Sequence, residues 1–98
     1  MKEVTTTEVE QMLAARQPVR LIDVRETEEL QEVKIPGVIH IPLGLLEFKL
    51  QDLPKEDTYV LICRSGGRSG RAAQLLESRG YDVMNMTGGM LDWNGPTE

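Results

Sequence analysis

Cysteine and histidine are nearly absent from this chain: each occurs once among its 98 residues, as Cys63 and His40. A single cysteine excludes an internal disulfide framework and any metal site built from several thiolates. Basic residues are also in the minority, with 11 Lys and Arg against 16 Asp and Glu, which gives a net charge of −5. Proteins that bind nucleic acid as their main partner need a broad basic face, so we expect no nucleic-acid partner.

Long apolar runs are missing as well. No stretch approaches the ~20 apolar residues of a membrane-spanning helix, and the first seven residues lack the apolar segment of a secretory signal peptide. We therefore expect no membrane association and a cytoplasmic location. The length fits one domain over residues 1–98, because single domains commonly run to ~100–150 residues.

The charges that are present are unevenly distributed. Residues 59–80 hold four arginines against one glutamate, whereas residues 81–98 hold three acids and no base. The only cysteine lies inside this positive segment. Because neighbouring cations favour the thiolate form of cysteine, this coincidence favours a functional site over a basic helix end in a solvated loop.

Hydrophobic patterning predicts strands that alternate with helices. Short β-branched or apolar runs predict strands over 19–24, 38–41, 59–62 and 81–86. Helices are predicted after a capping box at Thr5 and Glu8, over 26–32, over 45–53, and between the loop at 63–68 and Gly80, with a last helical turn at 90–93. This alternation predicts an α/β domain with a mainly parallel sheet.

Cys63 follows one of the apolar strands and opens a glycine-containing loop that leads into a helix. Ligands of open α/β sheets bind at the carboxyl ends of the strands, which is where this cysteine falls. Backbone N–H groups at the helix start, curled by Gly66 and Gly67, can converge on one anion. With Arg64 and Arg68 nearby, they favour a thiolate. Cys63 is therefore interpreted as an activated nucleophile, the alternative being a small buried apolar side chain.

Four segments of the chain resemble the single-domain rhodaneses, and they occur in that family's order. The first is Cys63-Arg64-Ser65-Gly66-Gly67-Arg68-Ser69 followed by Ala72-Ala73 and Gly80-Tyr81. The others are Asp23-Val24-Arg25 with Glu29, Ile35-Pro36-Gly37-Val38 through Ile41-Pro42, and Gly88-Gly89 with Trp93. The resemblance thus covers nearly the whole chain.

The resemblance implies a rhodanese-like three-layer α/β/α domain with a mainly parallel central sheet of about five strands. It also implies sulfurtransferase activity, in which a loop thiolate takes a sulfane sulfur from thiosulfate or a similar donor as a persulfide. Cys63 would be the catalytic residue. The substrate-binding residues would be those of the loop, namely Arg64, Ser65, Gly66, Gly67 and Arg68. The supporting residues would be Asp23, Arg25 and Ser69.

The partners that the resemblance implies are a small anionic sulfur donor and a thiol or cyanide acceptor, with a sulfur-relay protein as a further candidate. Neither a metal nor an organic cofactor is required by this chemistry. Asp23 and Arg25 come at the end of a strand, where they are expected either to support the active loop or to form a plain surface ion pair.

Three further positions, Lys34, Gly70 and His40, have no assigned part in this chemistry. Lys34, in a Val-Lys pair where the family usually has Gly-His, is interpreted as a surface lysine, with added charge near the site as the alternative. Gly70 lies inside a predicted helix, where glycine costs about 1 kcal/mol relative to alanine, and close packing against the sheet is the expected reason. His40 is expected to be structural or exposed to solvent, without a part in a Cys–His dyad.

Two other functions stay open. Phosphatases and arsenate reductases on a related fold space cysteine and arginine as Cys-X5-Arg, whereas Cys63 and Arg68 are separated by four residues. The shorter loop favours a single sulfur atom over a tetrahedral phosphate. A rhodanese-like module that only binds proteins commonly lacks the cysteine or part of the loop, and this chain has both.

Overall fold

The computed structural model describes all residues of the chain, 1–98, and is built on one five-stranded sheet. The strand order is β1-β5-β4-β2-β3, and every neighbouring pair is parallel. The strands are β1 (Lys2–Val4), β2 (Val19–Asp23), β3 (Ile39–His40), β4 (Thr58–Ile62) and β5 (Asp82–Met86). The prediction of a mainly parallel sheet of about five strands is confirmed.

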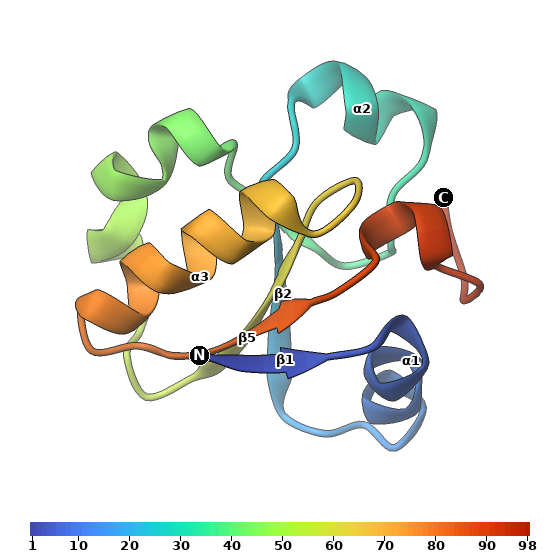
Figure 1. Ribbon diagram of the computed structural model, residues 1–98, viewed down its shortest axis with the longest axis horizontal. Helices are drawn as coiled ribbons and strands as arrows, with labels where there is room; N and C mark the ends of the chain where they lie inside the picture. Colours follow the sequence, from blue (N-terminus) through green and yellow to red (C-terminus); the bar gives the residue numbers. More distant parts are fainter.

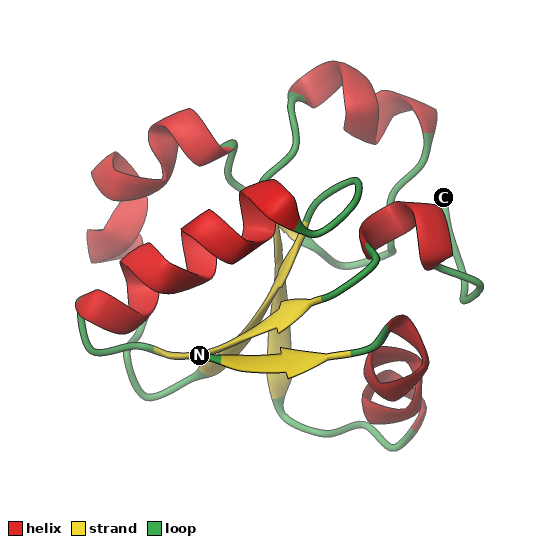
Figure 2. Ribbon diagram, viewed as in Figure 1, coloured by secondary structure: helices red, strands yellow, loops and turns green.

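Helices cover both faces of the sheet (Figures 1 and 2). They are α1 (Thr6–Ala14), α2 (Thr27–Glu32) and α3 (Gly67–Ser78), together with the 3-10 helices η1 (Leu43–Asp52) and η2 (Gly89–Asp92). None of them is long and apolar enough to cross a membrane. The α/β/α layering implied by the family resemblance is therefore the one observed.

The sheet separates two buried clusters because successive side chains of a strand point to opposite faces. Leu61 of β4 packs in the cluster that contains Ala73 of α3 and Leu46 of η1. Its neighbour Val60 packs in the other cluster, with Val9 of α1. Burial on both faces explains why the β4 sequence is almost continuously apolar.

The local predictions hold for most elements. The capping box is present, since the Thr5 hydroxyl oxygen accepts from the Glu8 N–H at 3.1 Å and the Glu8 carboxylate accepts from the Thr5 N–H at 2.9 Å. The helix α3 ends before Gly80, whose φ of +89° is favourable for glycine. The predicted strand over 38–41 is shorter than expected, with only Ile39–His40 paired to β2.

Two elements differ from the sequence prediction. The segment expected to be a helix over 45–53 is the 3-10 helix η1, Leu43–Asp52. The strand β1 was not predicted, because only Val4 of its three residues is buried and no alternation is visible in so short a segment. It forms by pairing with the edge of β5, Lys2 opposite Met84 and Val4 opposite Met86.

Parallel pairing brings the segments that follow β2, β4 and β5 to one edge of the sheet. The N–H of Val24, just after β2, donates to the carbonyl oxygen of Ile62 at the end of β4, at 2.9 Å. Cys63 follows Ile62 directly, and Thr87 follows β5. The fold therefore gathers the motifs that are far apart in the sequence around the loop that Cys63 opens.

Candidate active site

Cys63 is the first residue of the loop that joins β4 to α3, the yellow segment of Figure 1, and its side chain is almost fully buried. The backbone N–H of Gly66 donates to its sulfur with an N···Sγ distance of 3.0 Å. The Ser69 hydroxyl lies 3.3 Å from the same sulfur. Gly66 lies directly before the first residue of α3 and has a φ of +108°. This left-handed conformation turns the chain into the helix.

These donors determine the ionisation of the thiol. Burial raises the pKa of Cys63, because it removes water from the charged form. The Ser69 hydroxyl and the backbone N–H groups of Ser69, Gly66 and Ser65 lower it by hydrogen bonding. The donors outweigh burial, so the pKa of the Cys63 thiol lies below its ordinary value.

The loop is held from the other side by the Gly88-Gly89 pair, which the sequence identified only as a turn and a family motif. The N–H of Met90 donates to the Cys63 carbonyl oxygen at 2.9 Å, and that of Leu91 to the Arg64 carbonyl oxygen at 3.0 Å. Gly89 has φ +60°, and a Cβ built on it would overlap the Arg64 carbonyl and lie 2.6 Å from the Cys63 carbonyl oxygen. Only glycine fits this contact.

Arg68 forms a two-point ion pair with Glu29 of α2. Its Nη1 and Nη2 atoms donate to Oε1 and Oε2 of Glu29 at 2.7 and 2.8 Å. This pairing lowers the pKa of Glu29 to about 2 against the opposing effect of burial, with further help from the Glu26 N–H. The sequence had assigned Arg68 to substrate and quoted Glu29 only within a family motif, so their mutual contact was not foreseen.

Asp23 and Arg25 form a buried pair. Their exposed fractions are 0% and 3%, so the alternative of a surface ion pair is wrong. Arg25 Nη2 donates to Asp23 Oδ2 at 2.9 Å and to the carbonyl oxygen of Val33 at 2.8 Å. The pair thus ties the ends of α2 to the sheet, and Glu29 of α2 in turn binds Arg68.

The remaining predicted residues have simpler surroundings. His40 Nε2 donates to the Arg25 carbonyl oxygen at 2.8 Å, a structural contact of the kind expected. Lys34 is partly exposed and pairs with Glu98, with an Nζ···Oε1 distance of 3.7 Å. Arg64 is also exposed, forms no ion pair, and lines a cavity of about 290 Å³ beside the loop, together with Arg25, Glu29, Glu32, Val33, Met90 and Leu91.

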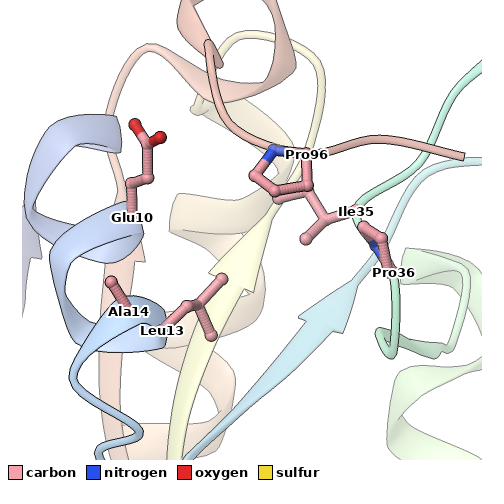
Figure 3. A pocket seen from close by; sticks show the side chains of 6 residues that line it. All are labelled: Glu10, Leu13, Ala14, Ile35, Pro36 and Pro96. Carbon is pink, nitrogen blue, oxygen red and sulfur yellow. The ribbon is translucent and has the colours of Figure 1, made fainter.

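A larger cavity of about 420 Å³ lies between α1, the segment around Ile35 and the C-terminal residues (Figure 3). Its walls are mostly apolar, and Glu10 is its only charged lining residue. No residue of the 63–68 loop lines it. The chain contains no cluster of three or more His, Cys, Asp or Glu side chains that could hold a metal ion.

The family model of the rhodanese-like domain matches residues 5–96, and the chain belongs to this family. It is 40% identical over 98 residues to "Putative sulfurtransferase YtwF" of Bacillus subtilis, covering 100% of this chain and 95% of that protein. It is 33% identical over 94 residues to a protein of Allochromatium vinosum named "Sulfurtransferase", covering 95% of this chain and 88% of the other.

Solved structures show the same fold. The crystal structure of a rhodanese-like domain protein from Staphylococcus aureus has a TM-score of 0.91 and 35% sequence identity, covering 96% of this chain and 92% of that one. The four segments that carried the family resemblance are thus part of a match over nearly the full length.

The contacts of Cys63 predict its reactivity. Iodoacetamide should alkylate it along a pH curve whose midpoint lies below that of a free thiol, because donors stabilise the thiolate. Ser69→Ala should raise the midpoint and slow alkylation at pH 7 about threefold to tenfold, the effect of losing one hydrogen bond. Ser78→Ala, at the exposed end of the same helix, is the matched control. Equal alkylation curves for the two variants would contradict this account.

The Glu29–Arg68 pair predicts a pH-dependent stability. Glu29→Gln should lower the free energy of unfolding at pH 7 by about 1–2 kcal/mol, a modest value because roughly a third of the pair is exposed. The folded pKa is depressed to about 2 from 4.5, so the stabilisation is complete above 4.5 and is lost as pH falls toward 2.

Denaturant unfolding of the wild type and of Glu29→Gln at several pH values between 7 and 2 measures how this difference in unfolding free energy depends on pH. The two stabilities should converge in the acid range. Glu28→Gln, an exposed glutamate one residue earlier that forms no ion pair, should match the wild type throughout. If Glu29→Gln were less stable than the wild type by the same free energy at every pH, the carboxylate charge would not be the cause.

The close approach at Gly89 predicts a steric requirement. Gly89→Ala should destabilise the protein by at least ~1–2 kcal/mol, the cost of a left-handed conformation for a residue with a Cβ, and should also displace the Cys63 loop. Gly44→Ala is the control, since nothing lies within 4 Å of its added Cβ. Thermal unfolding and the Cys63 alkylation rate measure both effects, and equal behaviour of the two variants would refute the requirement.

Proposed function

We propose that this chain transfers a sulfane sulfur from thiosulfate or a similar anionic donor to a thiol or cyanide, through a persulfide on Cys63. The observation that carries the proposal is the convergence of the Gly66 N–H and the Ser69 hydroxyl on the only thiol of a rhodanese-family chain. Cys63 also lies at the carboxyl edge of the sheet, which is where α/β folds usually bind their ligands.

The first step is nucleophilic attack. The Cys63 thiolate attacks the outer sulfur of thiosulfate, a new S–S bond forms, and the donor's S–S bond breaks. Sulfite leaves with the electron pair of the broken bond, and Cys63 becomes an anionic persulfide. Loop N–H groups hold this anion in the way that an oxyanion hole holds developing charge.

The second step restores the enzyme. An acceptor thiolate or cyanide attacks the outer sulfur of the persulfide, and the Cys63 thiolate leaves. Neither step needs a general base once the thiol has ionised. The only histidine, His40, is hydrogen-bonded to the Arg25 carbonyl, and the reaction does not require it. The acceptor thiol can belong to a small molecule or to a sulfur-relay protein.

The two arginines of the loop are given different parts in this proposal. Arg64 is exposed and free of ion pairs, and we assign to it the attraction of the donor and of the departing sulfite. Both terminal nitrogens of Arg68 already donate to Glu29, so its contribution is its charge and its anchoring of the loop. Asp23 and Arg25 support the loop through α2 in the same way.

The geometry supports sulfur transfer over phosphate chemistry. With its present hydrogen bonds, Arg68 directs both terminal nitrogens to Glu29 and not to a ligand held by the loop. The loop is also one residue shorter than Cys-X5-Arg. A purely binding module has no use for a thiol whose pKa is lowered by four converging donors.

The central test is mass spectrometry. After incubation with thiosulfate the intact protein should gain the mass of one sulfur atom, and cyanide should remove it as thiocyanate. Cys63→Ser should gain nothing and retain at most a few per cent of the turnover, whereas His40→Ala, if folded, should keep most of it. Sulfur loading of Cys63→Ser, or hydrolysis of p-nitrophenyl phosphate by the wild type faster than sulfur transfer, would overturn the proposal.

A further inference from the structure

Asn85 is a buried amide that the reaction described above does not use. It lies on β5 with 4% of its surface exposed, and it is the only buried Asn or Gln in the chain. The residues on either side of it, Met84 and Met86, pack in the apolar cluster on the opposite face of the sheet. Burying an amide in a central strand costs free energy unless both of its polar atoms are hydrogen-bonded, so its partners are informative.

Those partners are the two residues that bind the Cys63 sulfur. Asn85 Nδ2 donates to the carbonyl oxygen of Gly66 at 3.2 Å. Asn85 Oδ1 accepts from the Ser69 hydroxyl at 2.6 Å. The orientation of the amide follows from chemistry, because a backbone carbonyl can only accept and so must face the NH2 group.

The Ser69 hydroxyl has one proton and two acceptors within reach, the Cys63 sulfur and Asn85 Oδ1. When Cys63 is a thiol, its S–H can donate to the Ser69 oxygen while the Ser69 proton goes to Asn85. When Cys63 is a thiolate, the Ser69 proton is better placed on the sulfur. In the persulfide the charge moves to the outer sulfur, and the proton can return to Asn85.

We infer that Asn85 is a positioning residue for the Cys63 nucleophile, which it serves by holding the Ser69 hydroxyl and the Gly66 carbonyl from the sheet side. The inference deepens the proposed function and rests on the role given there to Cys63. A Cβ at Gly70 of α3 would lie 3.4 Å from Asn85 Nδ2, an ordinary contact distance, so packing against the sheet does not by itself require glycine at this position.

These contacts predict in which direction substitutions of Asn85 change the ionisation of Cys63. Asn85→Leu keeps a similar volume and removes both polar atoms, while Gly66 O still accepts from the Gly70 N–H at 3.0 Å. The Ser69 proton then has only the sulfur as an acceptor, which favours the thiolate over the thiol and disfavours the persulfide. Asn85→Asp has the opposite effect, because a carboxylate holds the Ser69 proton more strongly. The hydrogen bond to the Gly66 carbonyl is lost in both variants, since a carboxylate oxygen replaces the Nδ2 donor in Asn85→Asp.

The experiment is a double-mutant cycle read by iodoacetamide alkylation of Cys63 against pH. Asn85→Leu should lower the alkylation midpoint and slow persulfide loading by thiosulfate about tenfold. In a Ser69→Ala background it should leave the midpoint unmoved. Asn94→Leu, an exposed asparagine, is the control and should match the wild type in both readouts. A midpoint shift of equal size in both backgrounds, or no change in a folded Asn85→Leu protein, would overturn the inference.

If Asn85→Leu does not fold, Asn85→Asp tests the positioning role in its place, because aspartate has nearly the same shape as asparagine. Its midpoint should rise, and the rise should be smaller in the Ser69→Ala background. A rise of equal size in both backgrounds would assign the effect to charge alone and overturn the positioning role. Alkylation needs no sulfur donor, so coupled midpoints in a protein that thiosulfate fails to load would refute the proposed function and leave the positioning of Cys63 intact.

Discussion

A buried sulfur can carry negative charge only where hydrogen-bond donors replace the water it has lost. At Cys63 those donors come from the loop backbone and from Ser69, at the start of α3, where N–H groups have no partner inside the helix. The direction in which they point depends on one backbone conformation, the left-handed Gly66 that ends the loop. The rest of the site keeps that loop in place.

Three elements hold the loop from three directions. Glu29 of α2 anchors Arg68. Two backbone N–H groups of η2 donate to the carbonyl oxygens of Cys63 and Arg64. Asn85 of β5 donates to the Gly66 carbonyl from the sheet side. The buried Asp23–Arg25 pair makes the first of these rigid, because it fixes the ends of α2 to the sheet. The position of the Cys63 sulfur thus depends on three elements, α2, η2 and β5, that are distant from one another in sequence.

The sequence predicted those features whose cause is local. The apolar run of β4, the glycine loop and the capping box each involve residues a few positions apart, so their chemistry is visible in the printed order of side chains. β1 could not be found in this way, since Lys2–Val4 becomes a strand only where β5 offers it a free edge. The same reason hides Asn85, which looks like any residue of a strand until its partners Gly66 and Ser69 are known.

The sequence alone determined the α/β class and the family. It also singled out Cys63 as the proposed nucleophile, because a lone thiol after an apolar strand and before a glycine-rich helix start leaves one position for such chemistry. Tertiary structure alone decided what each arginine does. Arg64 and Arg68 are equivalent in the printed loop, yet one faces solvent and the other pairs with a carboxylate 39 residues away. A guanidinium binds whichever acceptor packing brings to it, and for Arg68 that acceptor, Glu29, is set by how α2 lies against the start of α3.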